Sequence, residues 1–318
     1  MSTAARRVRL RSLAKLNLSL LVLNKRSDGF HDLRTVFQTI SLADTIDIEF
    51  TPSRGREITL ESALDIPDNL IVRAANLLMD ALKIRGRVSF RLRKSIPMGG
   101  GLGGGSSNAA AVLLALPVLA GVPSDPARLA QLGAQLGSDV PFFLHGGTAL
   151  GVGRGTELYP LPEAPESPAL VVAPGIHVST PEAYGALGRS LTDDPRPGIL
   201  NSLQAFVWRS GGSAPAETGK SDNDFETVVF RQFPLLNAIK RKLLKAGASP
   251  AAMTGSGSAV FGVFESPGER DRAAASFPRE RVFSVKLVSR RSYRALWWRQ
   301  LGDHIAEKRW PPQSRYWK

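Results

Sequence analysis

The fold and function are decided by one glycine-rich stretch, Pro97-Met98-Gly99-Gly100-Gly101-Leu102-Gly103-Gly104-Gly105-Ser106-Ser107-Asn108. It holds six glycines in seven positions and opens directly into an alanine-rich segment. Glycine lets successive backbone N–H groups face one point, and a following helix adds the positive end of its dipole there. The natural ligand of that geometry is a polyphosphate. A flexible linker is the alternative, although linkers rarely open straight into such a helix.

Two better-known phosphate loops differ from this stretch. A P-loop of the form G-x-x-x-x-G-K-[ST] is absent, because no lysine follows the glycines. Gly99 to Gly104 matches G-x-G-x-x-G, but a dinucleotide site also expects an acidic residue at the end of the next strand. Asp125 instead lies between Ser124 and Pro126, a pattern typical of a turn.

The N-terminal segment reads as β-rich. Strict alternation over Lys15-Leu16-Asn17-Leu18-Ser19-Leu20 predicts a strand with its leucines on one face. Lys15 and Asn17 then point the same way. Asn24 to Gly29 is a turn signal. After the glycines, Ser106 to Leu116 predicts a helix that Pro117 and Gly121 interrupt.

A length of 318 residues favours one large or two ordinary domains. The proline-rich stretch from Pro160 to Pro168 is the best boundary. We therefore expect an N-terminal domain over 1–160 that contains the glycine-rich stretch, a C-terminal domain over 161–289 and a basic extension over 290–318. Ser210 to Ser221 reads as a surface loop.

Composition excludes several classes of protein. With no cysteine, disulfides and thiolate metal sites are excluded, and the four histidines form no zinc motif. No apolar run approaches the ~18–20 residues of a membrane span, so we expect a cytoplasmic protein.

Most of the net charge of +13 lies at the two ends of the chain. Residues 1–11 carry four Arg and no acid, and residues 290–318 carry eight Lys or Arg against two acids. Together the ends supply +10 of the +13, and the rest of the chain is nearly balanced. A basic tail accounts for this at least as well as a nucleic-acid site, so nucleic acid is not the expected partner.

The glycine-rich stretch resembles the ATP-binding motif of the GHMP kinases, the superfamily of galactokinase, homoserine and mevalonate kinases. Further stretches are similar to the branch whose substrate is a cytidine diphosphate-linked methylerythritol. They are Ala14 to Leu18, Asp28-Gly29-Phe30-His31-Asp32-Leu33, Gly137-Ser138-Asp139-Val140-Pro141-Phe142-Phe143 and, as a second glycine-rich loop, Thr254-Gly255-Ser256-Gly257-Ser258-Ala259.

The resemblance implies an α+β fold of two domains, the first like domain 2 of ribosomal protein S5 and the second a ferredoxin-like α/β plait. It implies that ATP, with Mg2+, phosphorylates the substrate's 2-hydroxyl in the methylerythritol phosphate route to isoprenoid precursors. Two alternatives remain open: another GHMP kinase, of homoserine or mevalonate type, and a catalytically silent nucleotide- or RNA-binding protein on the same fold.

The resemblance also assigns roles to single residues. Asp139 would accept or orient the proton of the substrate hydroxyl. Lys15 would hold Asp139 and the hydroxyl in place and stabilise the negative charge that develops. Alternatively, Asp139 is only a helix cap and Lys15 only a solvated strand residue. The substrate site would comprise Asn17, Phe30, His31, Thr180 and Tyr184, with Phe30 and Tyr184 as aromatic walls for the cytosine.

Two features stay open. Ser106 or Ser107 could approach the magnesium ion, but the protein ligands of the metal are not identified. The extension has apolar residues at near-helical spacing, which favours a docked amphipathic helix over a partner-binding or disordered tail. These residues are Tyr293, Leu296, Trp297, Trp298, Leu301 and Ile305.

Overall fold

A computed structural model describes residues 4–163, 165–188 and 223–317. The first half forms a six-stranded sheet in the order β3-β4-β2-β5-β6, with β1 paired to β2. Its strands are β1 (Arg6–Lys25), β2 (His31–Thr51), β3 (Arg56–Ser62), β4 (Gly86–Arg93), β5 (Thr148–Gly153) and β6 (Glu157–Pro160). The helices of this half are α1 (Leu70–Ala81), α2 (Gly104–Ala120), α3 (Pro126–Leu136) and α4 (Val140–His145).

The second half forms a four-stranded antiparallel sheet in the order β10-β7-β9-β8. This is the strand order of a ferredoxin-like plait, as expected. Its strands are β7 (Pro168–Ala173), β8 (Ala251–Met253), β9 (Val260–Val263) and β10 (Arg281–Lys286). Helices α5 (Thr180–Leu187), α7 (Glu226–Gln232), α8 (Pro234–Lys245) and α9 (Pro267–Ala275) belong to this half, and α10 (Arg290–Gln300) follows it. The loop predicted at 210–221 lies outside the described residues.

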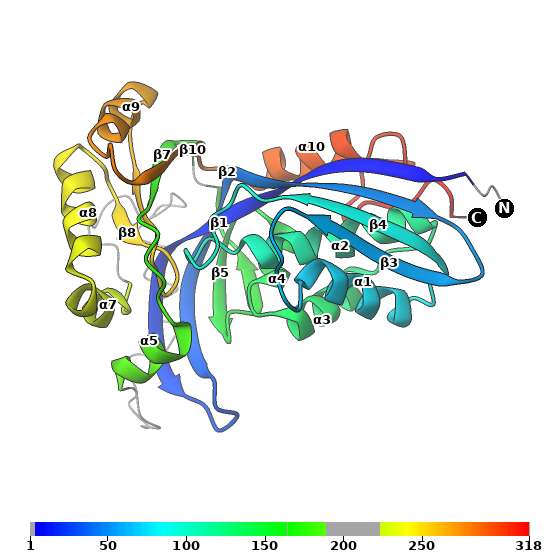
Figure 1. The fold of residues 1–318 in the computed structure, drawn as a ribbon, viewed down its shortest axis with the longest axis horizontal. Coiled ribbons are helices and arrows are strands. Elements are labelled where there is room, and N and C mark those ends of the chain that lie inside the picture. Colours follow the sequence, from blue (N-terminus) through cyan, green and yellow to red (C-terminus); the bar gives the residue numbers. More distant parts are fainter. Residues whose placement is uncertain (1–3, 164, 189–222, 318) are drawn as a thin grey trace.

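The long β1–β2 hairpin joins the two halves (Figure 1). Its middle packs between the sheets, where Leu16 and Ile40 meet Val171 and Phe261. Toward its turn, Leu20 packs into the core of the second half. The first sheet ends at β6 and the second begins at β7, and we propose the domain limits 1–160, 161–289 and 290–318 on this basis.

Helix α2 corrects one expectation. Pro117 was expected to interrupt it, but α2 runs from Gly104 to Ala120 with Pro117 inside, and it ends at Gly121. Proline costs the helix one backbone hydrogen bond. Here α2 is buried on all sides from Ser107 to Leu119, so tertiary packing holds the last turn in helical form.

The basic extension is docked on the first half. Tyr293, Trp297 and Leu301 are at most 2% exposed and join the core that contains α1 to α4. The expected amphipathic helix is therefore confirmed as α10. Both chain termini lie at the end of the molecule away from α7, α8 and α9 (Figure 1). Among the described residues, no helix is long and apolar enough to cross a membrane.

Candidate active site

The glycine-rich stretch lines a cavity of about 410 Å³. Of its residues Pro97 to Asn108, all except Ser107 contribute to the wall, together with residues that precede α1. Helix α2 begins at the end of the stretch, with Gly103 as its N-terminal cap in the left-handed region. The cavity thus combines free backbone N–H groups with the positive end of a helix dipole, the arrangement expected for phosphate.

Glycine is required at positions 101 and 103, because neighbouring atoms leave no room for a Cβ there. Both have φ near +70°, a backbone region that favours glycine. A Cβ on Gly101 would lie 2.1 Å from the carbonyl oxygen of Thr254. A Cβ on Gly103 would lie 2.9 Å from the ring of Phe143 and 3.1 Å from Cγ of Lys15. The loop is therefore packed directly against Lys15 and against the second glycine-rich segment.

Two polar residues of the stretch are committed to internal hydrogen bonds. Ser107 donates its hydroxyl to the Leu13 carbonyl at 2.7 Å. Asn108 is 3% exposed and donates its amide to Asp44 at 3.0 Å. Ser106 keeps a partly exposed side chain on the cavity wall. Of the two serines considered for magnesium, Ser106 is therefore the one that can face a ligand.

Lys15 and Asp139 are brought together beside the glycine-rich stretch, to which the Lys15 backbone is hydrogen-bonded at Leu102. Lys15 Nζ lies 3.3 Å from Asp139 Oδ2 and 2.6 Å from Asn17 Oδ1. The Lys15 side chain is 4% exposed, whereas that of Asp139 is 32% exposed, so the carboxylate is the member of the pair that faces outward. Asp139 precedes α4, but its side chain makes no cap hydrogen bond to the helix. The capping alternative is thus not what the geometry shows.

The second glycine-rich segment and Asn17 complete this centre. The Lys15 backbone N–H donates to the Leu102 carbonyl at 3.0 Å, and the Ala259 N–H donates to the Gly100 carbonyl at 3.3 Å. The Asn17 N–H donates to the Thr254 hydroxyl at 3.0 Å. The two loops and β1 are therefore hydrogen-bonded into one unit.

The residues expected around a cytosine lie near the hairpin turn. His31 and Tyr184 stack on each other, with centroids 4.8 Å apart and planes 20° apart. Tyr184 also packs edge-on against Phe225. Burial, with a smaller contribution from the charge of Asp139, raises the pKa of Tyr184 to about 12. Burial, with repulsion from Lys25, lowers the pKa of His31.

Phe30 and Thr180 are placed differently. Phe30 is 48% exposed, and the Arg154 guanidinium lies 3.5 Å from its ring centroid. The ring stacked on Tyr184 is thus His31, while Phe30 carries a cation on one face. The Thr180 hydroxyl lies 2.8 Å from the Ser256 hydroxyl, which links α5 to the second glycine-rich segment.

Lys94 is a cavity residue that no sequence motif singled out. It lines the cavity, and its Nζ lies 2.7 Å from Asp44 Oδ2. Asp44 is fully buried and also accepts the backbone N–H groups of Ser95 and Ile96. The signal was a lysine three residues before Pro97, but nothing in sequence placed its partner Asp44 beside it.

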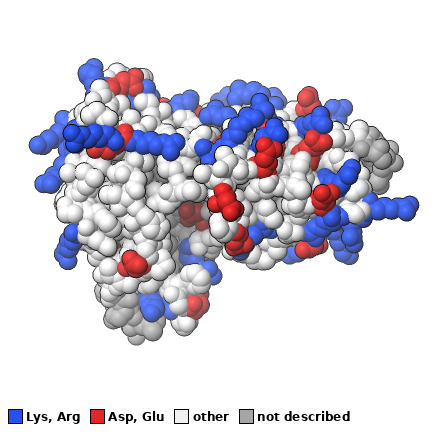
Figure 2. Space-filling view, viewed as in Figure 1, with Lys and Arg blue, Asp and Glu red and all other residues white. Residues whose placement is uncertain are grey.

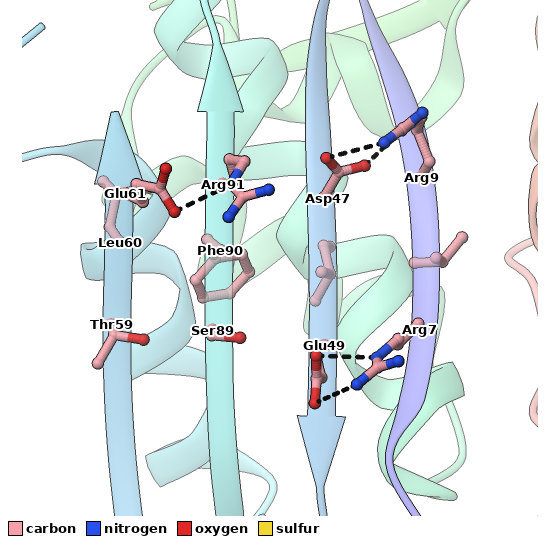
Figure 3. A pocket seen from close by; sticks show the side chains of 12 residues that line it. Arg7, Arg9, Asp47, Glu49, Thr59, Leu60, Glu61, Ser89, Phe90 and Arg91 are labelled. Carbon is pink, nitrogen blue, oxygen red and sulfur yellow. Dashed lines mark hydrogen bonds and ion pairs between the residues drawn. The ribbon is translucent and has the colours of Figure 1, made fainter. Parts of the chain in front are cut away.

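A larger hollow, of about 570 Å³, lies on the outer face of the first sheet (Figure 3). Its walls carry cross-strand ion pairs, Arg7 with Glu49 and Arg9 with Asp47. Exposed pairs of this kind contribute little to stability. Neither of the two glycine-rich segments, 97–108 and 254–259, is among the residues that line this hollow. Acidic and basic side chains are interspersed on this side of the molecule (Figure 2).

Metal-binding groups are sparse. Within residues 4–163, 165–188 and 223–317, no three His, Asp or Glu side chains cluster as a metal site. A magnesium ion here would depend on phosphate oxygens and water for most of its ligands.

Comparison with known proteins identifies the family. Residues 69–147 match the GHMP kinases N terminal domain, and residues 212–282 match GHMP kinases C terminal. A 4-diphosphocytidyl-2-C-methyl-D-erythritol kinase of Solibacter usitatus (strain Ellin6076) is 54% identical over 99% of both chains. The relative of that name from Moorella thermoacetica is 44% identical over 87% of this chain and 96% of its own length.

Solved structures agree with these relatives. The crystal structure of a 4-(cytidine 5'-diphospho)-2C-methyl-D-erythritol kinase, 37% identical, covers 88% of this chain and 98% of its own with a TM-score of 0.71. A homoserine kinase from Cytophaga hutchinsonii, 18% identical, shares the fold with a TM-score of 0.67. The chain belongs to the 4-diphosphocytidyl-2-C-methyl-D-erythritol kinase family of the GHMP kinases.

Proposed function

We propose that this kinase transfers the γ-phosphoryl group of ATP to the 2-hydroxyl of 4-diphosphocytidyl-2-C-methyl-D-erythritol in the methylerythritol phosphate pathway. The observation that carries the proposal is the Lys15–Asp139 pair, held against the glycine-rich cavity by the Lys15 N–H bond to Leu102. Phosphoryl transfer needs an oriented hydroxyl and neutralised phosphate charge more than covalent chemistry, and this centre offers both.

The proposed step uses Asp139 as the proton acceptor. The substrate hydroxyl oxygen attacks the γ-phosphorus, the bond from that phosphorus to the β,γ-bridging oxygen breaks, and ADP leaves. The hydroxyl proton passes to the Asp139 carboxylate, the outward-facing member of the pair. Lys15 holds this carboxylate in place and offsets the negative charge that develops. Asn17 fixes Lys15 through its carbonyl oxygen.

ATP and magnesium occupy the cavity in this proposal. Backbone N–H groups of Gly99 to Ser106 would hold the phosphates, and Lys94, paired with Asp44, forms part of the wall. Magnesium neutralises phosphate oxygens when it is bound, and Ser106 is the hydroxyl we assign to approach it.

The aromatic residues near the hairpin turn would hold the cytidine. Phe30, His31 and Tyr184 supply ring faces for the pyrimidine, and Thr180 lies beside the second glycine-rich segment, where we place the diphosphate or sugar. This pocket favours the cytidyl substrate over the homoserine and mevalonate alternatives. We also propose that the enzyme works in the cytoplasm.

ADP release with Mg-ATP tests the proposal against a panel of 4-diphosphocytidyl-2-C-methyl-D-erythritol, mevalonate, homoserine and galactose. Turnover confined to the cytidyl compound is the expected result. Turnover of another panel member would support kinase activity but contradict the proposed cytidine pocket. Absence of turnover with all four, combined with salt-dependent RNA retention by the full chain, would instead favour the silent binding protein.

A further inference from the structure

The C-terminal extension reaches the helix that begins beside Asp139. The Tyr293 hydroxyl donates to the Phe143 carbonyl at 2.5 Å, and the Trp310 indole N–H donates to the Leu144 carbonyl at 3.0 Å. Both acceptors belong to the last turn of α4, whose final carbonyls have no partner within the helix. Two donors from the extension therefore satisfy carbonyls that α4 itself leaves open.

The contact between the extension and the end of α4 is closely packed and buried. A Cβ on Gly146, the residue after α4, would lie 2.2 Å from the Tyr293 ring. Tyr293, Trp297 and Trp310 form an aromatic cluster with ring centroids 6.1 to 6.5 Å apart. Burial raises the pKa of the Tyr293 phenol, so the hydroxyl remains a donor throughout the neutral range.

Helix α4 is short enough to transmit this contact. Its six residues span only about 9 Å, so its C-terminal carbonyls and the Asp139 backbone move as one piece. Asp139 has no cap hydrogen bond of its own to fix it. The extension also supports α2, because Ser314 donates to the Val118 carbonyl at 2.7 Å near the end of that helix. Both helices that begin at the active centre are thus held at their far ends by the same segment.

We propose that residues 290–316 act as a positioning clamp, in which Tyr293 and Trp310 hold the end of α4 and thereby keep Asp139 opposite Lys15. This rests on the proposed function, since it concerns the residue assigned to accept the proton. Tyr293 and Trp310 touch no reacting group and act only through α4.

The test compares Tyr293→Phe and Trp310→Phe with the control Trp298→Phe in the full chain. Trp298 lies on the same helix, α10, but its indole N–H donates to the Arg309 carbonyl within the extension. We expect each of the first two variants to lower kcat about 3- to 10-fold, the effect of one buried hydrogen bond on the transition state, with the KM for ATP within about 2-fold. The control should keep kcat within about 2-fold.

A double-mutant cycle separates positioning from general destabilisation. In an Asp139→Glu background, whose carboxylate is already displaced, Tyr293→Phe should have no further effect on kcat. Unchanged kcat in both clamp variants, or an undiminished effect in that background, would overturn the proposal.

Hydrogen exchange of residues 140–146 reports on the clamp without any turnover. Faster exchange in Tyr293→Phe than in Trp298→Phe supports the clamp, and equal exchange contradicts it. If wild-type protein shows no turnover while exchange responds as expected, the proposed function fails and the contact to α4 stands.

Discussion

Lys15 Nζ lies 3.3 Å from Asp139 Oδ2 across the interface between β1 and the start of α4. The lysine is buried and bound to Asn17, whereas the carboxylate is partly exposed. This asymmetry separates their roles, because only Asp139 can meet a substrate hydroxyl while Lys15 stays in place behind it.

Replacing Asp139 by Asn keeps the shape of the side chain and removes its charge and basicity. Proton acceptors of this kind contribute about 10²- to 10⁴-fold to rate, so we expect kcat to fall by that range. Steady-state ADP release measures the change, and an unchanged thermal midpoint confirms that the variant is folded. A loss of less than about tenfold would mean that Asp139 does not accept the proton.

Gly101→Ala tests the phosphate loop. Its Cβ would collide with the Thr254 carbonyl, and its φ of +72° is costly for alanine by about 1–2 kcal/mol. We expect the KM for ATP to rise at least about tenfold, a change of about 1.4 kcal/mol. Gly268→Ala is the matched control, because Gly268 is an exposed, helical glycine of α9 outside both glycine-rich segments, and its Cβ would lie 3.7 Å from the Arg272 side chain. Equal KM values for the two variants would argue against the loop as the ATP site.

Tyr184→Ala tests the cytidine pocket. Stacking of a base on an aromatic ring is worth about 1–3 kcal/mol, so we expect the KM for the cytidyl substrate to rise about 10- to 100-fold. The KM for ATP should stay unchanged, and Tyr184→Phe should retain most of the affinity. If Tyr184→Ala raises both KM values together, the ring supports the fold and not the base.

His145 makes stability depend on pH. Burial, with repulsion from Arg294 and Arg290, lowers the pKa of His145 in the folded protein. Below about pH 6.5 the unfolded chain therefore binds the proton first, and the free energy of unfolding falls as pH decreases by up to about 1.4 kcal/mol per unit. His145→Gln should lose less stability than wild type between pH 7 and 5.5 in urea titrations. Equal losses of stability in His145→Gln and wild type would show that His145 does not cause the pH dependence.

Local patterns in the sequence predicted much of this site. Alternation in β1 placed Lys15 and Asn17 on one face, and their side chains are indeed hydrogen-bonded. The glycines predicted a ligand cavity, and the stretch lines one in the structure. Local patterns could not predict contacts between segments that lie far apart in the sequence. The stacking of His31 on Tyr184 and the burial of Lys94 against Asp44 depend on how the hairpin and the two sheets meet.

Pro117 is a position where a local sequence preference gave the wrong prediction. Its local preference predicted a break, but α2 is surrounded by core on every side, and burial outweighed the lost hydrogen bond. In the extension, periodicity predicted the helix but not the part of the protein against which the helix packs. Tyr293 and Trp297 predicted a docked face, whereas the carbonyls of α4 that the extension caps became visible only in the fold.

The position of the new phosphate ester tests the central claim most directly. The 2-carbon of the proposed substrate carries a methyl group and no hydrogen, so a phosphate ester there has no three-bond coupling to a carbinol proton. The ³¹P NMR spectrum of the product formed with Mg-ATP should therefore show a new phosphomonoester signal as a singlet, absent with Asp139→Asn. A signal split by carbinol protons, or the same singlet at wild-type rate in Asp139→Asn, would contradict the account.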